Sequence, residues 1–197
     1  MASFLNFPPP DHADEDWSAV IEKAEQSMGY LPNYLKLYGL HPAAYQAWRG
    51  LAHSIFSQMD ERRYELATVA AARRLRSSYC SLAHGKILAE KFHTPDEVTG
   101  FYTGDDLGAL DDVDQAVVDL ADKVAADATS VTEADIERLR GLGLSDRDIL
   151  DVILAAAARC FFAKVTDAAG VLPDAAFQGL DPGMREALTV GRPIEPA

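Results

Sequence analysis

The chain has 197 residues, of which 48% are hydrophobic and 25% charged, and its formal net charge at pH 7 is −13. A surface this acidic repels nucleic acids and anionic membranes, so neither is expected as a partner. The length is sufficient for one substantial hydrophobic core, and we expect a single domain over residues 1–197.

Two cysteines are too few for a disulfide framework in a chain of this size, so a reducing compartment, the cytoplasm, is expected. Residues 1–10 lack the basic start and the apolar stretch of a signal peptide. The most apolar segment, residues 149–162, contains Asp151 and Arg159 and is shorter than the ~20 residues that a membrane-spanning helix requires. We predict a buried helix there.

Apolar residues recur with helical spacing along nearly the whole chain, and no run alternates with the period of a strand. Gly29 is expected to end the first helix, Asp60 to cap a later one, and Thr94 to cap a helix that starts at Pro95. Capping boxes with Asp in the place of Glu are expected at Thr132-x-x-Asp135 and Ser145-x-x-Asp148. Together with the helix that starts at Pro95, the predicted helices cover residues 14–28, 43–58, 61–75, 78–92, 113–126, 132–141, 146–169 and 182–190, and residues 34–38 are expected to form a short turn. The sequence therefore predicts an all-α fold of about 8–10 helices.

A polar connector is expected between an N-terminal half (1–102) and a C-terminal half (113–197). Residues 103–112 contain two glycines and four aspartates. They lack the alternating ligands, central glycine and closing glutamate of an EF-hand, so no calcium site is predicted.

Glu65, Cys80 and His84 are the residues that best combine into a chemical site. Cys80 and His84 are four residues apart, so on a helix they share a face, and the imidazole can take the thiol proton. A straight helix would separate Glu65 from Cys80 by about 22 Å, so the chain must bend between them. Residues 76–78 are the expected bend, with Ser77 or Ser78 at the start of a second helix. Cys80 then lies in a first turn, where free amides and the helix dipole favour the thiolate, the nucleophilic form of cysteine.

The remaining candidates are weaker. His53 precedes the Glu65 helix and is a candidate pocket residue, whereas three other histidines without a second ligand are expected to be surface or packing residues: His12, His41 and His93. Tyr34 and Trp48, in a set of aromatic residues with helical spacing, are candidate pocket residues. No phosphate-binding, dinucleotide-binding or nucleophile-elbow motif occurs, so no cofactor and no metal are predicted.

The same three residues carry a resemblance to a known family. A Glu, fifteen positions to a Cys, then four to a His on an Ala-rich stretch resembles the core motif of the carboxymuconolactone decarboxylase superfamily, in particular its alkylhydroperoxidase D (AhpD)-like, peroxidase-related branch. That branch has Cys-x-x-Cys-x-x-x-His preceded by the Glu. On this chain Glu65 matches the relay carboxylate, Cys80 the second cysteine and His84 the relay histidine. Tyr79 matches an aromatic residue that is common before that cysteine. The first motif cysteine is replaced by Ser77.

Two further segments extend the resemblance over roughly residues 17–175. Residues 29–33, followed by His41-Pro42, are similar to the Pro-Asn and later Pro that precede the motif. Residues 155–171 are similar to the closing helix of the branch.

The resemblance implies an AhpD-like orthogonal helical bundle and a thiol-dependent peroxidase. In this reading Cys80 reduces a small hydroperoxide, His84 and Glu65 move protons, and an external thiol or protein reductant restores the enzyme. Because Ser77 cannot form a disulfide, Cys160 or another thiol would have to resolve the oxidised sulfur. The resemblance also implies a homo-oligomer, a trimer or hexamer.

Two alternatives remain open from the sequence. One is a decarboxylase-like lyase in which Glu65 and His84 act as general acid and base. The other is a catalytically silent oligomeric module with the same architecture.

Overall fold

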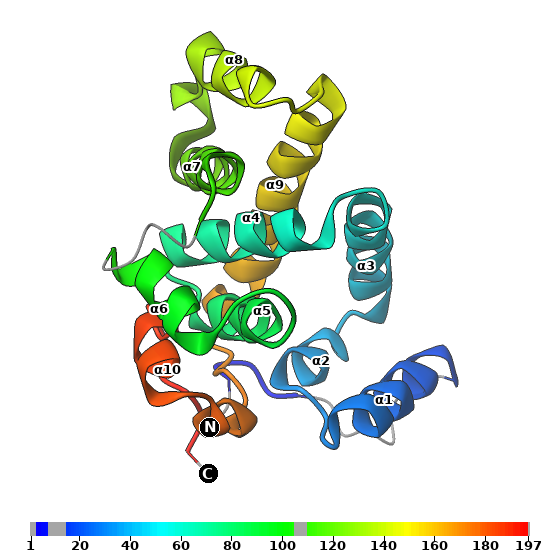
Figure 1. The fold of residues 1–197 in the computed structure, drawn as a ribbon. Helices are drawn as coiled ribbons and strands as arrows, with labels where there is room; N and C mark the ends of the chain where they lie inside the picture. Colours follow the sequence, from blue (N-terminus) through cyan, green and yellow to red (C-terminus); the bar gives the residue numbers. More distant parts are fainter. Residues whose placement is uncertain (1–2, 8–14, 105–109, 197) are drawn as a thin grey trace.

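Helix α4 (Glu61–Arg74) runs through the middle of the molecule, and the other helices are arranged around it (Figure 1). The computed structural model describes residues 3–7, 15–104 and 110–196. Helices α5, α7 and α9 pack directly on α4, so helices from both predicted halves of the chain share its surface. The segment 105–109 of the predicted connector, and His12, lie outside the described residues.

Ten α-helices and no strand occur in the described part of the chain, which confirms the all-α prediction. Besides α4 they are α1 (Glu15–Met28), α2 (Asn33–Tyr38), α3 (Pro42–Phe56), α5 (Ser78–Lys91), α6 (Pro95–Thr103), α7 (Asp112–Asp127), α8 (Glu133–Gly141), α9 (Asp146–Ala168) and α10 (Pro182–Leu188). Two short 3₁₀ turns that periodicity did not predict follow α7 and α9, at Ala128–Ser130 and Ala175–Gly179.

The ends of the predicted helices lie within two residues of their predicted positions because the capping residues are those that the sequence indicated. The segment expected as a short turn is instead the six-residue helix α2. The Asp60 side chain accepts a hydrogen bond from Arg63 N at the start of α4. Both predicted capping boxes are present, at Thr132–Asp135 and Ser145–Asp148, and Thr94 forms a third with Glu97. Gly29 ends α1 with φ of +79°, a conformation that glycine adopts without steric cost.

Nine consecutive residues of α4, from Tyr64 to Ala72, are buried. A helix that is buried on all sides lies inside a protein rather than on its surface. Four of the nine are alanines, whose small side chains let neighbouring helices approach closely: Ala67, Ala70, Ala71 and Ala72. The central position of α4 therefore follows from its composition, and it places Glu65 in the interior.

The chain reverses direction between α4 and α5 through Arg76, which has φ of +58°. The C-terminal segment holds this reversal. Arg76 Nε donates to Val190 O at 3.2 Å, and Gly191 N donates to Ser78 Oγ at 2.8 Å. The backbone at Gly191 approaches the turn so closely that a Cβ atom there would collide with Arg76 O. Ser77 is the residue before α5, as the sequence predicted for one of the two serines.

None of the described helices combines the length and the apolar composition that a bilayer-spanning segment needs.

We predict that Gly191→Ala destabilises the protein, because the added methyl group collides with the backbone of the α4–α5 turn. The free energy of unfolding should fall by about 1–3 kcal/mol, as for other overpacked sites. Gly50→Ala is the matched control: Gly50 lies within α3, and an added Cβ meets no atom within 4 Å. That variant should be as stable as the parent or gain up to about 1 kcal/mol. Equal stability of the two variants in chemical denaturation would contradict this role of Gly191.

Candidate functional site

Helices α4 and α5 bring Glu65 and His84 into contact. His84 Nδ1 and Glu65 Oε2 are 2.6 Å apart, and the Glu65 side chain is 4% exposed, against 17% for His84. The two residues are 19 positions apart in the sequence, and they meet because α5 folds back along α4. The predicted bend therefore produces the predicted carboxylate–imidazole pair.

The surroundings of His84 favour its neutral form. Burial and the positive charge of Arg159 lower the pKa of His84, and the Glu65 carboxylate opposes them. A carboxylate only accepts hydrogen bonds, so we assign the ring proton to Nδ1, which donates it to Glu65. Nε2 is then left with a lone pair, as a general base requires.

Cys80 lies in the first turn of α5 and is 1% exposed. Arg159 Nη1, from α9, donates a hydrogen bond to Cys80 Sγ at 3.5 Å. Within the described structure, no hydrogen bond joins Cys80 to His84. Of the predicted relay from Glu65 through His84 to Cys80, only the Glu65–His84 contact is therefore present. Arg159 connects His84 and Cys80 indirectly, since it donates a hydrogen bond to Cys80 and its charge lowers the pKa of His84.

Arg159 is a buried cation held among aromatic rings. The residue is 4% exposed, and its Cζ lies 5.5 Å from the ring centroid of Phe162 and 6.0 Å from that of Trp48. Burial by itself lowers the pKa of Arg159, but the electrostatic effects of Cys80, Tyr64 and Glu65 more than compensate and raise it. A guanidinium in this setting favours an anion beside it, and the atom it touches is the sulfur.

Ser77 and Tyr79 flank the cysteine but have structural contacts. Ser77 is completely buried, and its backbone N–H donates to Ala72 O at 2.8 Å. The Tyr79 hydroxyl donates to the buried Asp174 carboxylate, which also accepts from Asn33 N at 2.8 Å. Asp174 thus ties α2, α5 and the segment after α9 together. The Pro-Asn segment noted in the sequence is therefore part of the scaffold of the site.

The other sequence candidates lie in different environments. Trp48 is next to Arg159, whereas the ring of Tyr34 packs among Tyr45, Tyr79 and Phe162. His53 is exposed on α3 and makes no side-chain hydrogen bond within the described structure. Cys160 is partly exposed and forms no disulfide, and burial raises the pKa of its thiol.

Sequence reasoning missed Arg159 as a site residue. Its signal was present, because a single arginine in a run of alanine and aromatic residues is costly to bury without a purpose. What the sequence lacks is the information that this face of α9 packs on Cys80, 79 residues earlier in the chain.

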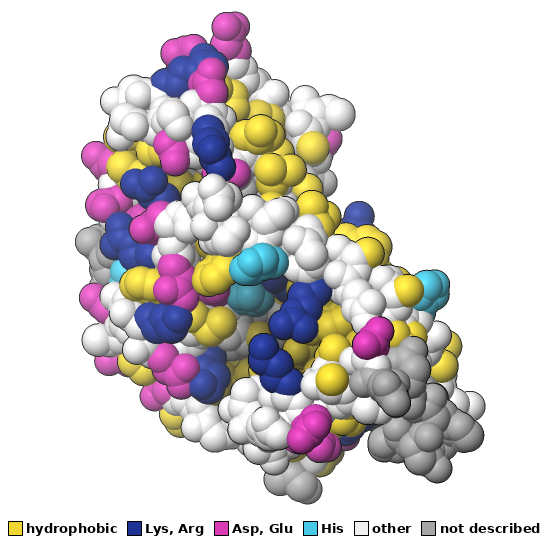
Figure 2. Space-filling model, turned by 90° about the vertical axis from the view of Figure 1, so that its right-hand side faces the viewer, with side chains coloured by type: hydrophobic (Ala, Val, Ile, Leu, Met, Phe, Trp, Pro, Cys, Tyr) yellow, Lys and Arg dark blue, Asp and Glu magenta, His cyan; other side chains and the backbone are white. Residues whose placement is uncertain are grey.

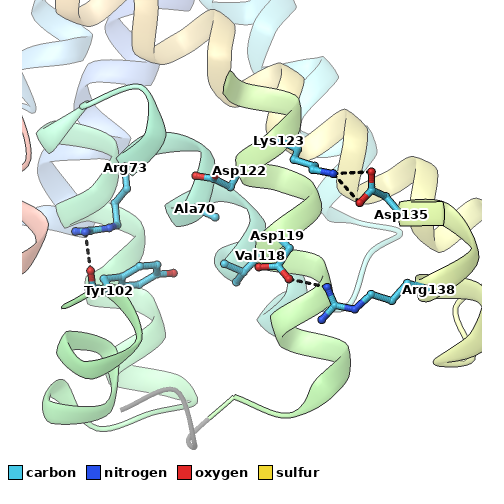
Figure 3. A pocket seen from close by; sticks show the side chains of 9 residues that line it. All are labelled: Ala70, Arg73, Tyr102, Val118, Asp119, Asp122, Lys123, Asp135 and Arg138. Carbon is cyan, nitrogen blue, oxygen red and sulfur yellow. Dashed lines mark hydrogen bonds and ion pairs between the residues drawn. The ribbon is translucent and has the colours of Figure 1, made fainter. Parts of the chain in front are cut away.

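A hollow of about 480 Å³ lies away from these residues, among α4, α6, α7 and α8 (Figure 3). Its charges are already paired: Lys123 contacts both carboxylate oxygens of Asp135 at 2.7 Å, and Arg138 contacts Asp119 at 2.7 Å. Arg73 donates to the backbone oxygen of Tyr102. The hollow is not lined by cysteine, serine or histidine, and we assign it no chemistry. Among the described residues, no cluster of His, Cys, Asp or Glu could hold a metal ion.

The fold of this chain is that of AhpD-like helical proteins. The structure is similar to the alkylhydroperoxidase AhpD core of an uncharacterised peroxidase-related protein from Ralstonia eutropha JMP134 (TM-score 0.82, 22% identity, 90% of this chain and 95% of that one). It is also similar to an uncharacterised peroxidase-related protein from Silicibacter sp. TM1040 (TM-score 0.81, 24% identity, 91% and 95%). The debrominase Bmp8 has the same fold at 15% identity (TM-score 0.73, 95% and 97%). No family model and no curated protein matches the sequence. The AhpD-like fold expected from the motif is confirmed.

We predict that NMR of the histidine rings shows His84 neutral at pH 7, protonated at Nδ1, with a pKa below the ordinary value of about 6.5. Glu65→Gln removes the negative charge that favours the imidazolium form, so the pKa of His84 should fall further. The ring signals of exposed His53 are the internal control and should be the same in both proteins. A His84 pKa that rises or stays constant in the variant would contradict the assigned pairing.

Proposed function

We propose that this protein is a thiol-dependent peroxidase in which Cys80 reduces small hydroperoxides. The observation that carries the proposal is the contact between the buried Arg159 guanidinium and Cys80 Sγ, one helical turn from the Glu65–His84 pair. A cation and a helix N-terminus both favour the thiolate, which is the reactive form of cysteine. The neutral imidazole of His84 is available to accept a proton.

The proposed reaction has three balanced steps. The Cys80 thiolate attacks the terminal oxygen of ROOH, an S–O bond forms, and the O–O bond breaks. Sulfur loses two electrons and becomes a sulfenic acid, and the leaving RO⁻ takes a proton to become ROH. We assign to His84 Nε2 the role of taking the proton that the Cys80 thiol loses and passing it to RO⁻; both transfers go through a bridging water or the substrate, since His84 has no direct bond to the sulfur. Two external thiols then reduce the sulfenic acid, releasing water and a disulfide.

The burial of Cys80 favours small substrates. A sulfur atom in a side chain that is 1% exposed is reached more easily by hydrogen peroxide or a short alkyl hydroperoxide than by a bulky molecule. The rings around the site are packed against one another, with the ring centroids of Trp48 and Phe162 4.3 Å apart. A bulky substrate would have to separate them.

The reductant is proposed to be an external thiol or a reducing protein. Ser77, which stands at the first position of a Cys-x-x-Cys spacing, has no sulfur with which to form a disulfide. Cys160 is the only other cysteine in the sequence, and it is not bonded to Cys80 in the structure. A one-cysteine cycle, resolved from outside, therefore fits the residues present.

The decarboxylase-like alternative uses Glu65 and His84 but gives Cys80 no role. Activity that survives complete alkylation of the thiols would favour that alternative. A variant of the debrominase Bmp8 in which one cysteine is replaced by alanine has been crystallised in complex with 2,3,4-tribromopyrrole, so this compound is a suitable second substrate to test here. The burial of Cys80 favours the smaller hydroperoxides over 2,3,4-tribromopyrrole.

We also propose that the chain forms a homo-oligomer, a trimer or hexamer, in the cytoplasm. The support for the oligomer is an apolar groove of about 490 Å³ between α3 and α9, bordered by exposed side chains such as Leu51, Leu154 and Phe161. Figure 2 views the side of the molecule on which α3 and α9 lie, and hydrophobic side chains form a band in its upper half. A second copy would cover such a band. The groove also contains Trp48, which places it beside the site.

We predict that Cys80→Ser consumes hydrogen peroxide no faster than buffer containing the reductant alone. Cys160→Ser is the matched control, since it also replaces one sulfur by oxygen, and it should retain most of the activity. Ser77→Cys restores the Cys-x-x-Cys spacing and should permit an internal disulfide after peroxide treatment, detected by mass spectrometry. Undiminished peroxide consumption by Cys80→Ser would overturn the proposed function.

A further inference from the structure

Two buried polar groups close to Cys80 have no hydrogen-bond partner among the described residues. They are the hydroxyl oxygen of Tyr38 and Nε of Arg159, and both residues are 4% exposed. Buried polar groups are paired in nearly all folded proteins, because an unpaired group keeps the full cost of leaving water. Two unpaired donors beside one nucleophile therefore point to an acceptor that binds there.

Both groups belong to the surroundings of the same sulfur. Arg159 donates to Cys80 Sγ through Nη1 and makes no bond through Nε or Nη2 within the described structure. The Nε–Nη2 side of a guanidinium is a planar fork that suits two oxygen atoms. Tyr38 packs in one cluster with Cys80 and Phe162, and its ring stacks on Phe162 with centroids 5.7 Å apart.

The electrostatics place the Tyr38 hydroxyl near both partners. Burial raises the pKa of Tyr38 to about 12; the Cys80 sulfur adds to the rise and Arg159 opposes it. The phenol thus stays protonated at any physiological pH and serves as a hydrogen-bond donor. Arg159 stays charged for the reason given above. Both side chains therefore present hydrogen-bond donors, which suit an electron-rich oxygen atom.

We propose that Arg159, through its Nε–Nη2 fork, and Tyr38, through its hydroxyl, bind the oxygen atoms of the hydroperoxide and stabilise the leaving oxygen during attack by Cys80. This inference rests on the proposed function and assigns two further catalytic residues to it. Donors aimed at an atom on which charge develops act most strongly in a site that excludes water. Arg159 then has two tasks, one on the sulfur and one on the substrate, carried by different nitrogen atoms of one rigid group.

The kinetic test compares two reactions of Cys80, oxidation by hydrogen peroxide and alkylation by iodoacetamide. Alkylation requires the thiolate but has no peroxide oxygen to bind. Tyr38→Phe should slow oxidation about tenfold or more, as loss of an oxyanion donor does, and leave alkylation within about twofold. Tyr45→Phe is the matched control, the same change in the same aromatic cluster, and should alter neither rate. Arg159→Lys keeps the charge but loses the fork, so it should slow oxidation more than alkylation.

Equal effects on both reactions, or none, would overturn the inference, because the two residues would then act on the sulfur alone or not at all. A second readout is independent of turnover. In Cys80→Ser protein, hydrogen peroxide should shift the NMR signal of the Arg159 Nε–H group in a saturable manner, and less so when Tyr38→Phe is added. If this shift occurs although wild-type Cys80 is not oxidised, the binding site stands and the peroxidase proposal fails. If Cys80 is oxidised normally in Tyr38→Phe and no shift occurs, the peroxidase proposal stands and the proposed binding site fails.

Discussion

The site depends on the reversal of the chain between α4 and α5. It passes through Arg76 in a left-handed conformation, which costs a residue other than glycine about 1–2 kcal/mol. Contacts from Val190 and Gly191 hold the turn in place, so the C-terminal segment offsets that cost. Because α5 then lies along α4, His84 returns to Glu65, and Cys80 lies in the first turn of α5, where its sulfur contacts Arg159 of α9.

Because the chain reverses between α4 and α5, three helices each supply a different group to the site. Helix α4 supplies a buried carboxylate, α5 the cysteine and the imidazole, and α9 the guanidinium of Arg159. The charges are arranged so that Glu65 orients His84 and Arg159 attracts the sulfur. Asp174 accepts a hydrogen bond from Tyr79, the residue before Cys80, and so anchors the first turn of α5 to the segment that follows α9. The chemistry is assembled from parts that are distant in the sequence, and none of the three helices could form it alone.

The sequence could predict what is local in the site. Serine residues after an Ala-rich helix indicated the bend, and the fifteen-residue spacing of Glu65 and Cys80 required it. Helix ends followed from Asp60, Thr94, Ser145 and other caps, because a cap is decided by neighbours within four residues. The AhpD-like resemblance added the fold, which periodicity alone gave only as helical.

What the sequence could not predict is long-range packing. His84 was expected to contact Cys80, yet the sulfur has Arg159 as its partner, since the direction of a side chain on α5 depends on which helix packs against it. Tyr79 is adjacent to the cysteine but serves the scaffold. His53 was considered for the pocket because it precedes α4, but the face of α3 on which it lies is exposed.

The most direct test is a comparison of the two cysteines in one sample. The intact protein is treated with one equivalent of hydrogen peroxide together with a reagent that traps sulfenic acids, and the labelled peptides are quantified over time. Exposure alone predicts that Cys160, the more accessible thiol, reacts first. Our account predicts the opposite order, with Cys80 labelled well before Cys160 because Arg159 and the helix start activate the buried sulfur. Labelling of Cys160 first, or no labelling of Cys80, would contradict it.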